Sequence, residues 1–168
     1  SALDISEAIV GYVKLGEQVR RLAIIPARGG SKGVPKKNLR KVAGKSLLEW
    51  AISFALESSM FDAVICSTDD PEIANLANAC GATFMGFRPA ALSGDRVSDI
   101  EVMRYEIERA IAHHNSSFDT IAMLQPTSPL RKLADLIGGI KMLEDKDLDA
   151  VWSISPAPLH YHPLKMLQ

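Results

Sequence analysis

The sequence has few of the features that mark secreted, membrane-spanning or nucleic-acid-binding proteins. It contains two cysteines in 168 residues, Cys66 and Cys80, whose spacing matches neither a disulfide framework nor a metal site. The formal net charge of −1 excludes a general attraction to nucleic acid or anionic membranes. No apolar run approaches the ~18 residues of a membrane span, and residues 1–21 show no signal-peptide pattern. We therefore expect a soluble, cytoplasmic protein in a reducing compartment.

Aromatic residues make up only 6% of the chain, whereas hydrophobic residues make up 47% and charged residues 23%, as is typical of one domain with a single core. Short apolar runs alternate with segments of helical periodicity. The predicted strands are 22–25, 63–67, 83–87, 120–124 and 150–154, and the predicted helices are 46–59, 70–80, 98–113 and 133–144. This order predicts an α/β fold, a three-layer sandwich with a mostly parallel, Rossmann-like sheet and a ligand crevice at the carboxyl ends of its strands.

Three of the predicted helices begin with a capping signal. Ser46–Glu49 and Ser98–Glu101 have the spacing of a capping box, in which the serine and the glutamate satisfy each other's backbone N–H groups. The pair Asp70-Pro71 supplies an N-cap followed by a proline at the first helical position. These signals fix where the helices start more firmly than periodicity alone does.

The segment after the first predicted strand concentrates positive charge. Seven of the chain's 19 lysines and arginines lie between Arg28 and Lys45, and none of its 20 acidic residues does. Gly29, Gly30 and Gly33 allow the backbone to approach a ligand and to turn N–H groups toward it. An arginine fork grips two phosphate oxygens, while lysines act as point charges. A loop of this composition at the end of a first strand indicates a polyphosphate site.

Two common nucleotide-binding motifs are absent from this loop. Neither the GxxxxGK[ST] pattern of Walker P-loops nor the GxGxxG pattern of dinucleotide-binding folds occurs. One alternative is a solvated basic loop that touches RNA. Residues 28–45 contain no aromatic side chain on which a base would stack, which disfavours this alternative.

The sequence Ile24-Ile-Pro-Ala-Arg-Gly-Gly-Ser-Lys-Gly-Val-Pro-Lys-Lys-Asn-Leu39 resembles the signature loop of the N-acylneuraminate (CMP-sialic acid) cytidylyltransferases. Further segments are similar in family order: Ser67–Asp70, Arg88–Leu92, Leu124–Arg131 and His162–Lys165. The resemblance assigns residues 22–168 to a cytidylyltransferase nucleotide-binding domain that is incomplete at its C-terminus and has the family's nucleotidyltransferase sheet. Residues 1–21 form an unassigned N-terminal extension, with loosely helical spacing over 4–18.

The resemblance implies transfer of CMP from CTP to a nine-carbon 2-keto sugar acid, with release of pyrophosphate. The anomeric hydroxyl of the sugar attacks the α-phosphorus, so cations must offset the negative charge that gathers there. Arg28 and Lys37 match the family's catalytic residues, and Gln125 and Lys165 match its sugar contacts. The nucleotide-binding positions carried over from the family are Arg28, Gly29, Gly30, Ser31, Lys32, Lys37, Asn38, Arg88, Val97 and Ser98.

Members of this family continue beyond the position of Gln168. By resemblance, the residues beyond that position contain an arm that forms a homodimer and an aspartate pair that holds Mg²⁺. We therefore expect no metal ligands in this chain itself. The alternative function is a non-catalytic CTP-binding module that lacks the metal carboxylates. The sugar is N-acetylneuraminate or a relative such as legionaminate or pseudaminate. The 3-deoxy-octulosonate cytidylyltransferases fit the loop and the segment at Gln125 less well.

Several of these polar residues also have a structural explanation. Asp69 and Asp70 suggest a metal pair, but Asp70 before Pro71 favours a helix cap. Gln125 belongs to a proline-rich turn, although its position after a strand favours a ligand contact. Arg88 is either a base contact or an ordinary surface arginine.

The histidines and one tryptophan are expected to be structural. His113-His114 suits the C-terminus of a helix, where imidazoles interact favourably with the helix dipole. His160 and His162 are two residues apart, but no third metal ligand lies near them in the sequence. Trp152 falls on a predicted strand and is expected in the core.

Overall fold

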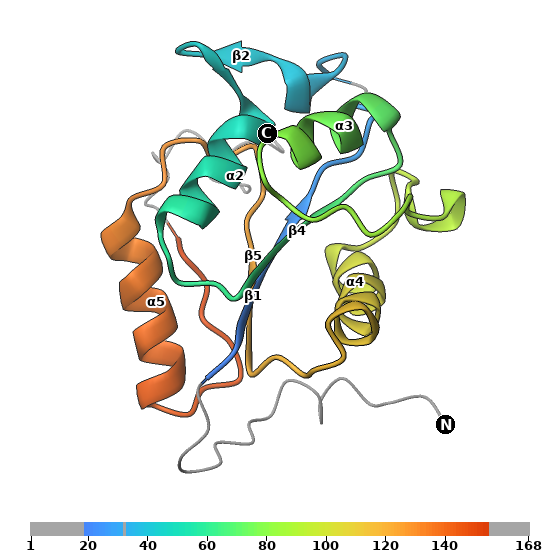
Figure 1. Ribbon diagram of the computed structural model, residues 1–168. Helices are drawn as coiled ribbons and strands as arrows, with labels where there is room; N and C mark the ends of the chain where they lie inside the picture. Colours follow the sequence, from blue (N-terminus) through green and yellow to red (C-terminus); the bar gives the residue numbers. More distant parts are fainter. Residues whose placement is uncertain (1–18, 32, 155–168) are drawn as a thin grey trace, which may run out of the picture.

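A three-stranded parallel sheet forms the centre of the computed structural model, which describes residues 19–31 and 33–154 (Figure 1). The sheet has the order β4-β1-β5, and Leu22 lies opposite both Ala63 and Ile121. The strands are β1 (Arg21–Pro26), β4 (Ala63–Ser67) and β5 (Thr120–Met123). All three were predicted from the sequence, and so was their parallel arrangement.

All four predicted helices in the described part of the chain are present. Their capping signals are confirmed: Ser46 and Ser98 each accept the N–H group three residues on, and Asp70 accepts those of Glu72 and Ile73. The α-helices are α2 (Leu47–Glu57), α3 (Pro71–Ala79), α4 (Asp99–His114) and α5 (Leu133–Asp145), and the 3-10 helices are η1 (Lys37–Leu39) and η2 (Ala90–Leu92). None of the helices in the described ranges is long and apolar enough to cross a membrane.

Alternate residues of β1 face opposite layers of the molecule. Ala23 and Ile25 pack in a cluster with α2, α3 and α5, whereas Leu22 and Ile24 pack in a second cluster with α4. Figure 1 shows α2 and α5 on one side of the sheet and α4 on the other. All four β1 residues are fully buried, and each buried leucine or isoleucine contributes about 1.5–3 kcal/mol. The predicted three-layer α/β sandwich is therefore confirmed.

The predicted strand at residues 83–87 is reduced to one bridge, in which Thr83 pairs with Ile65 of β4. The chain turns away from the sheet at Gly86, whose φ of 105° is outside the range of a strand. The carbonyl groups of Met85 and Gly86 accept hydrogen bonds from the Arg109 side chain in place of a neighbouring strand. The Arg109 side chain, which belongs to α4, thus takes the place of backbone hydrogen bonds to a neighbouring strand. No pattern within residues 83–87 indicates this contact.

The predicted strand at residues 150–154 is wrong, since residues 151–154 are irregular. The prediction that Trp152 lies in the core is also wrong, because this residue is 84% exposed. An apolar run becomes a strand only where a sheet edge accepts its backbone groups, and within the described ranges the sheet ends at β5. The predicted helix at residues 4–18 lies outside the described residues.

A small hairpin before α2 was not predicted. Its strands β2 (Lys41–Val42) and β3 (Lys45–Ser46) pair in the antiparallel sense. Ala43 and Gly44 join them with positive φ values of 50° and 88°, as a two-residue hairpin turn requires. The hairpin carries the chain from the basic loop to the Ser46 cap.

Glu144 joins α5 to the sheet. Its carboxylate accepts two hydrogen bonds from Arg21, at 2.7 and 2.8 Å, and one from Thr120 at 2.9 Å. The hydrogen bonds from Arg21 hold the pKa of Glu144 below its usual range. The pair is a bidentate contact between β1 and α5, the geometry in which an ion pair contributes most.

We expect Glu144→Gln to lower the free energy of unfolding by about 1 kcal/mol at pH 7. Because the folded pKa lies below the unfolded one, the contribution of Glu144 is present above the unfolded pKa and is lost as the pH falls through the folded pKa. Urea denaturation at pH 7 and pH 3 should therefore show a difference between variant and wild type that shrinks at pH 3. Asp145→Asn, at an exposed neighbour, is the control; a Glu144→Gln deficit independent of pH would contradict the assignment.

Candidate functional site

The three strands end at the upper edge of the sheet in Figure 1, and a hollow of about 280 Å³ opens at that edge. The predicted site residues that line it are Arg28, Ser31, Lys37, Asn38, Arg88, Val97 and Gln125. The predicted residues that are not part of its lining are Gly29, Gly30 and Ser98, while Lys32 and Lys165 lie outside the described residues. The fold thus gathers three cations from two separate segments around one cavity.

The loop after β1 is held by the loop after β4. Gly29 N–H donates to Oδ1 of Asp69 at 2.9 Å, and Nδ2 of Asn38 donates to the carbonyl of Arg28 at 3.0 Å. Asn38 is buried. In this structure the Gly29 N–H is already bound within the protein, and the Asn38 amide braces the loop. These contacts fix the backbone from which the Arg28 side chain extends.

Gly29 packs against the cap of α3. A Cβ atom at this position would lie 2.5 Å from Oδ2 and 2.8 Å from Cβ of Asp70. We expect Gly29→Ala to lower the free energy of unfolding by about 1–3 kcal/mol, the usual cost of overpacking, because the cap must shift. Gly30→Ala is the matched control, since no described atom lies within 4 Å of its added Cβ. Equal thermal stability of the two variants would contradict the packing role.

Arg28 is paired with Asp95, a residue that was not predicted. Its Nη1 lies 2.5 Å from Oδ1 of Asp95, and both side chains are 34% exposed. Asp95 also lines the hollow. The carboxylate thus occupies one side of a guanidinium whose fork suits an anionic oxygen pair.

Arg88 is a buried cation at the wall of the hollow. It is 6% exposed, and its backbone N–H donates to the carbonyl of Thr68 at 2.8 Å. Burial lowers the pKa of its guanidinium, while the charges of Asp69 and Glu106 act in the opposite direction. Among the described residues, Nε of Arg88 has no hydrogen-bond partner. A buried donor left unpaired costs about 1–3 kcal/mol. The alternative of an ordinary surface arginine is wrong.

A buried hydrogen-bond network lies behind Arg88. Glu106 on α4 is 1% exposed, accepts from Oγ of Ser67 at 2.8 Å, and pairs with Arg109 at 3.2 Å. Burial raises the pKa of Glu106, while the hydrogen bond from Ser67 and the nearby arginines lower it. Arg109 in turn binds the carbonyl groups of residues 85–86. The network therefore ties the end of β4 to the segment that leads into Arg88.

Gln125, two residues after the end of β5, is held at both its backbone and its side chain. Its carbonyl accepts a hydrogen bond from Arg131, and its Nε2 donates to Oδ2 of Asp99 at 2.9 Å. Asp99 is the first residue of α4 and was not predicted as a site residue. Both Gln125 and Asp99 line the hollow. The first residue of α4 thus holds the amide at the wall of the hollow.

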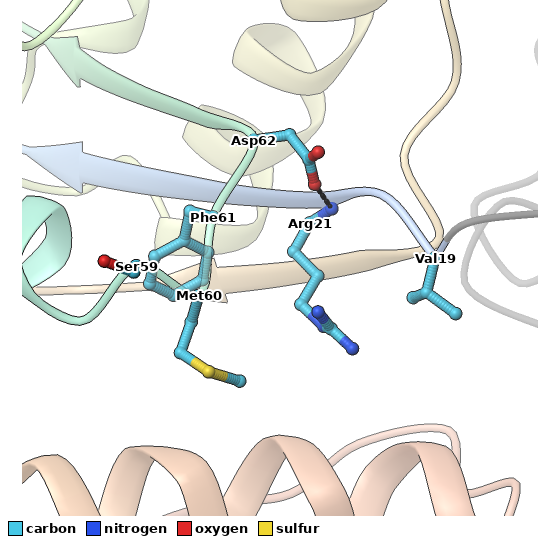
Figure 2. A pocket seen from close by; sticks show the side chains of 6 residues that line it. All are labelled: Val19, Arg21, Ser59, Met60, Phe61 and Asp62. Atoms are coloured by element: carbon cyan, nitrogen blue, oxygen red, sulfur yellow. Dashed lines mark hydrogen bonds between the residues drawn. The ribbon is translucent and has the colours of Figure 1, made fainter.

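A second hollow lies at the other edge of the sheet, by the amino ends of β1 and β4 (Figure 2). The residues that line it are Val19, Arg21, Ser59, Met60, Phe61 and Asp62. Asp62 accepts the backbone N–H of Arg21 at 2.7 Å, and the Arg21 guanidinium is bound to Glu144. The charged groups of this hollow are engaged in holding the fold together, so the candidate site is the hollow at the carboxyl edge.

Candidate metal ligands are not clustered in the described part of the chain. No three His, Cys, Asp or Glu side chains come together in residues 19–31 and 33–154. The suggestion of a metal pair at Asp69 and Asp70 is not supported, because Asp69 accepts the Gly29 N–H and Asp70 caps α3, as predicted. His160 and His162 lie outside the described residues. No step of the chemistry is therefore assigned to a metal held by this part of the chain.

Comparison with known proteins shows the family of this chain. The cytidylyltransferase family matches residues 22–154. An N-acylneuraminate cytidylyltransferase from Escherichia coli is 37% identical over 123 residues, which cover 73% of this chain and 28% of that protein. A pseudaminic acid cytidylyltransferase from Campylobacter jejuni is 40% identical over 112 residues, 67% of this chain and 48% of that protein. The chain thus spans about half or less of the length of these two relatives.

A solved structure has the same fold. The structure described as CMP:2-keto-3-deoxy-manno-octonic acid synthetase complexed with CTP aligns with a TM-score of 0.61 and 24% identity, over 75% of this chain and 48% of that chain. The nucleotidyltransferase sheet expected from the sequence is therefore confirmed. With a family match that extends over most of its length, this chain belongs to the cytidylyltransferase family.

Proposed function

We propose that this chain is the nucleotide-binding part of an enzyme that transfers CMP from CTP to a nine-carbon 2-keto sugar acid. The observation that carries the proposal is the convergence of Arg28, Lys37 and Arg88 on one hollow at the carboxyl edge of the sheet. Ligands of open parallel sheets bind at this edge. Three cations in one hollow match the charge of a triphosphate better than that of a neutral ligand.

Each cation has a distinct role in the proposed reaction. Arg28 holds two phosphate oxygens with its fork, and Lys37 adds a point charge as pyrophosphate leaves and negative charge shifts onto the leaving oxygen. Ser31 and Asn38 supply hydrogen bonds near the phosphates and ribose. Arg88 contacts the base or ribose from the wall of the hollow. The remaining nucleotide contacts proposed from the family pattern are Gly29, Gly30, Lys32, Val97 and Ser98.

The sugar acid is proposed to bind beside the phosphates. Gln125 contacts it from the end of β5, and Lys165 pairs with its carboxylate. Mg²⁺ is proposed as the cofactor of the complete enzyme, where it would neutralise phosphate charge. The complete protein is further proposed to act as a cytoplasmic homodimer.

One experiment separates the enzyme from a non-catalytic CTP-binding module. The complete protein is mixed with CTP, Mg²⁺ and either N-acetylneuraminate or pseudaminate, and pyrophosphate release is followed. Release that depends on one sugar acid supports the enzyme. Thermal stabilisation by CTP without turnover supports the binding module, since ligand at 100 times Kd adds about 2.7 kcal/mol. ATP at the same concentration is the control for general polyphosphate binding.

A further inference from the structure

The hydrogen bond between Gln125 and Asp99 determines which way the Gln125 amide faces. A carboxylate only accepts hydrogen bonds, so the amide must turn its Nε2 toward Asp99, at the observed 2.9 Å. The reverse orientation would place Oε1 against a negatively charged oxygen. The bond from Arg131 to the Gln125 carbonyl fixes the backbone of the same residue. With one N–H of Nε2 donated to Asp99, the amide keeps its second N–H and presents Oε1 as an acceptor.

Asp99 itself is held in place by the start of α4. Ser98 and Glu101 form a reciprocal capping box around it, with Ser98 N–H donating to Glu101 at 2.9 Å. A carboxylate in the first turn is also stabilised by the helix dipole. The backbone of Asp99 is therefore fixed by the helix start, and its carboxylate lies within hydrogen-bond distance of the amide.

The hollow is lined by both cationic residues and hydrogen-bond acceptors. Arg28, Lys37 and Arg88 attract anionic groups, whereas Asp99 and the Oε1 atom of Gln125 offer only acceptors. A carboxylate or a phosphate is repelled by such a pair. A neutral group with a hydrogen to donate, such as a hydroxyl or an acylamino N–H, is complementary to it.

We propose that Asp99 is a positioning residue that holds the Gln125 amide so that Oε1 accepts a hydrogen bond from a hydroxyl or acylamino N–H group of the sugar acid. This inference rests on the proposed function. It adds which end of the sugar meets Gln125: the uncharged substituents, with the carboxylate directed to Lys165 as proposed above.

The test is Asp99→Ala in the complete protein, assayed for pyrophosphate release with CTP, Mg²⁺ and the sugar acid that the wild type uses. Removal of a negative charge should by itself tighten the binding of an anionic sugar. Positioning predicts the opposite: a KM for the sugar acid raised about 5- to 10-fold, the loss of roughly one hydrogen bond, with the KM for CTP changed less than 2-fold. Asp99→Asn, which keeps an acceptor oxygen, should restore at least half of this loss on a logarithmic scale.

Asp135→Ala is the matched control, because Asp135 is also an exposed aspartate in the first turn of a helix but does not line the hollow. It reproduces the lost dipole interaction and should leave both KM values unchanged. If the KM for the sugar acid in Asp99→Ala is equal to or lower than that in Asp135→Ala, the inference is overturned while the proposed function still stands. Thermal unfolding of both variants shows whether they remain folded. If Asp99→Ala is unfolded, Asp99→Asn is assayed in its place. A wild type that neither binds nor turns over any sugar acid overturns the proposed function, and the inference with it.

Discussion

Arg28→Ala is expected to weaken CTP binding by about 10- to 100-fold. A hydrogen bond to a charged group contributes about 1.5–3 kcal/mol, and each 1.4 kcal/mol is a factor of ten in affinity. The substitution also leaves the charge of Asp95, now 2.5 Å from the guanidinium, to face the phosphates without that cation. Isothermal titration calorimetry with CTP measures the change directly.

Two further variants make this prediction specific. Arg28→Lys keeps the charge but loses the fork, so its affinity should fall between those of the wild type and Arg28→Ala. His113→Ala, in the last turn of α4 and not part of the hollow's lining, should bind CTP as the wild type does. Equal losses in His113→Ala and Arg28→Ala would show that the phosphates do not bind at the loop after β1.

Glu106→Ala is expected to lower the free energy of unfolding by about 3–5 kcal/mol. Removal of one partner of a buried ion pair leaves the other charge uncompensated, which is the most costly way to break such a pair. Here the substitution deprives Arg109 of its carboxylate and Ser67 of its acceptor, in a region where Glu106 is 1% exposed. Urea denaturation followed by circular dichroism gives the difference.

The control is Glu108→Ala, at an exposed position two residues along the same helix, which should change stability by no more than about 0.5 kcal/mol. Because Arg109 also anchors the segment before Arg88, a Glu106 variant that remains folded should bind CTP more weakly. A Glu106→Ala protein as stable as Glu108→Ala would contradict the network.

Local signals in the sequence predict most of the elements that position the site. The capping boxes at Ser46 and Ser98 and the cap at Asp70 depend on residues no more than three apart, and all three caps are present. The strand at 150–154 failed because pairing with a sheet edge is decided by distant residues. The strand at 83–87 failed because Arg109, from another element, takes its carbonyl groups.

The residues that surround the site were harder to predict than those that line it. Glu106 carried a usable signal, since it lies between Val102 and Ala110 on the buried face of α4, where a charged residue needs a partner. Asp95 and Asp99 carried none, because their importance arises from contacts with Arg28 and Gln125, which are 67 and 26 residues away in the chain. Only the folded chain brings these pairs together.

The ion pair between Arg28 and Asp95 has a consequence for how the affinity for nucleotide depends on salt. In the proposed complex, CTP does not meet a bare cation at this position but replaces the carboxylate of Asp95. Added salt weakens the internal pair and the incoming phosphate contact together, because both are partly exposed to the same ions. Arg28 therefore contributes less to the ionic-strength dependence of nucleotide binding than its charge alone would suggest.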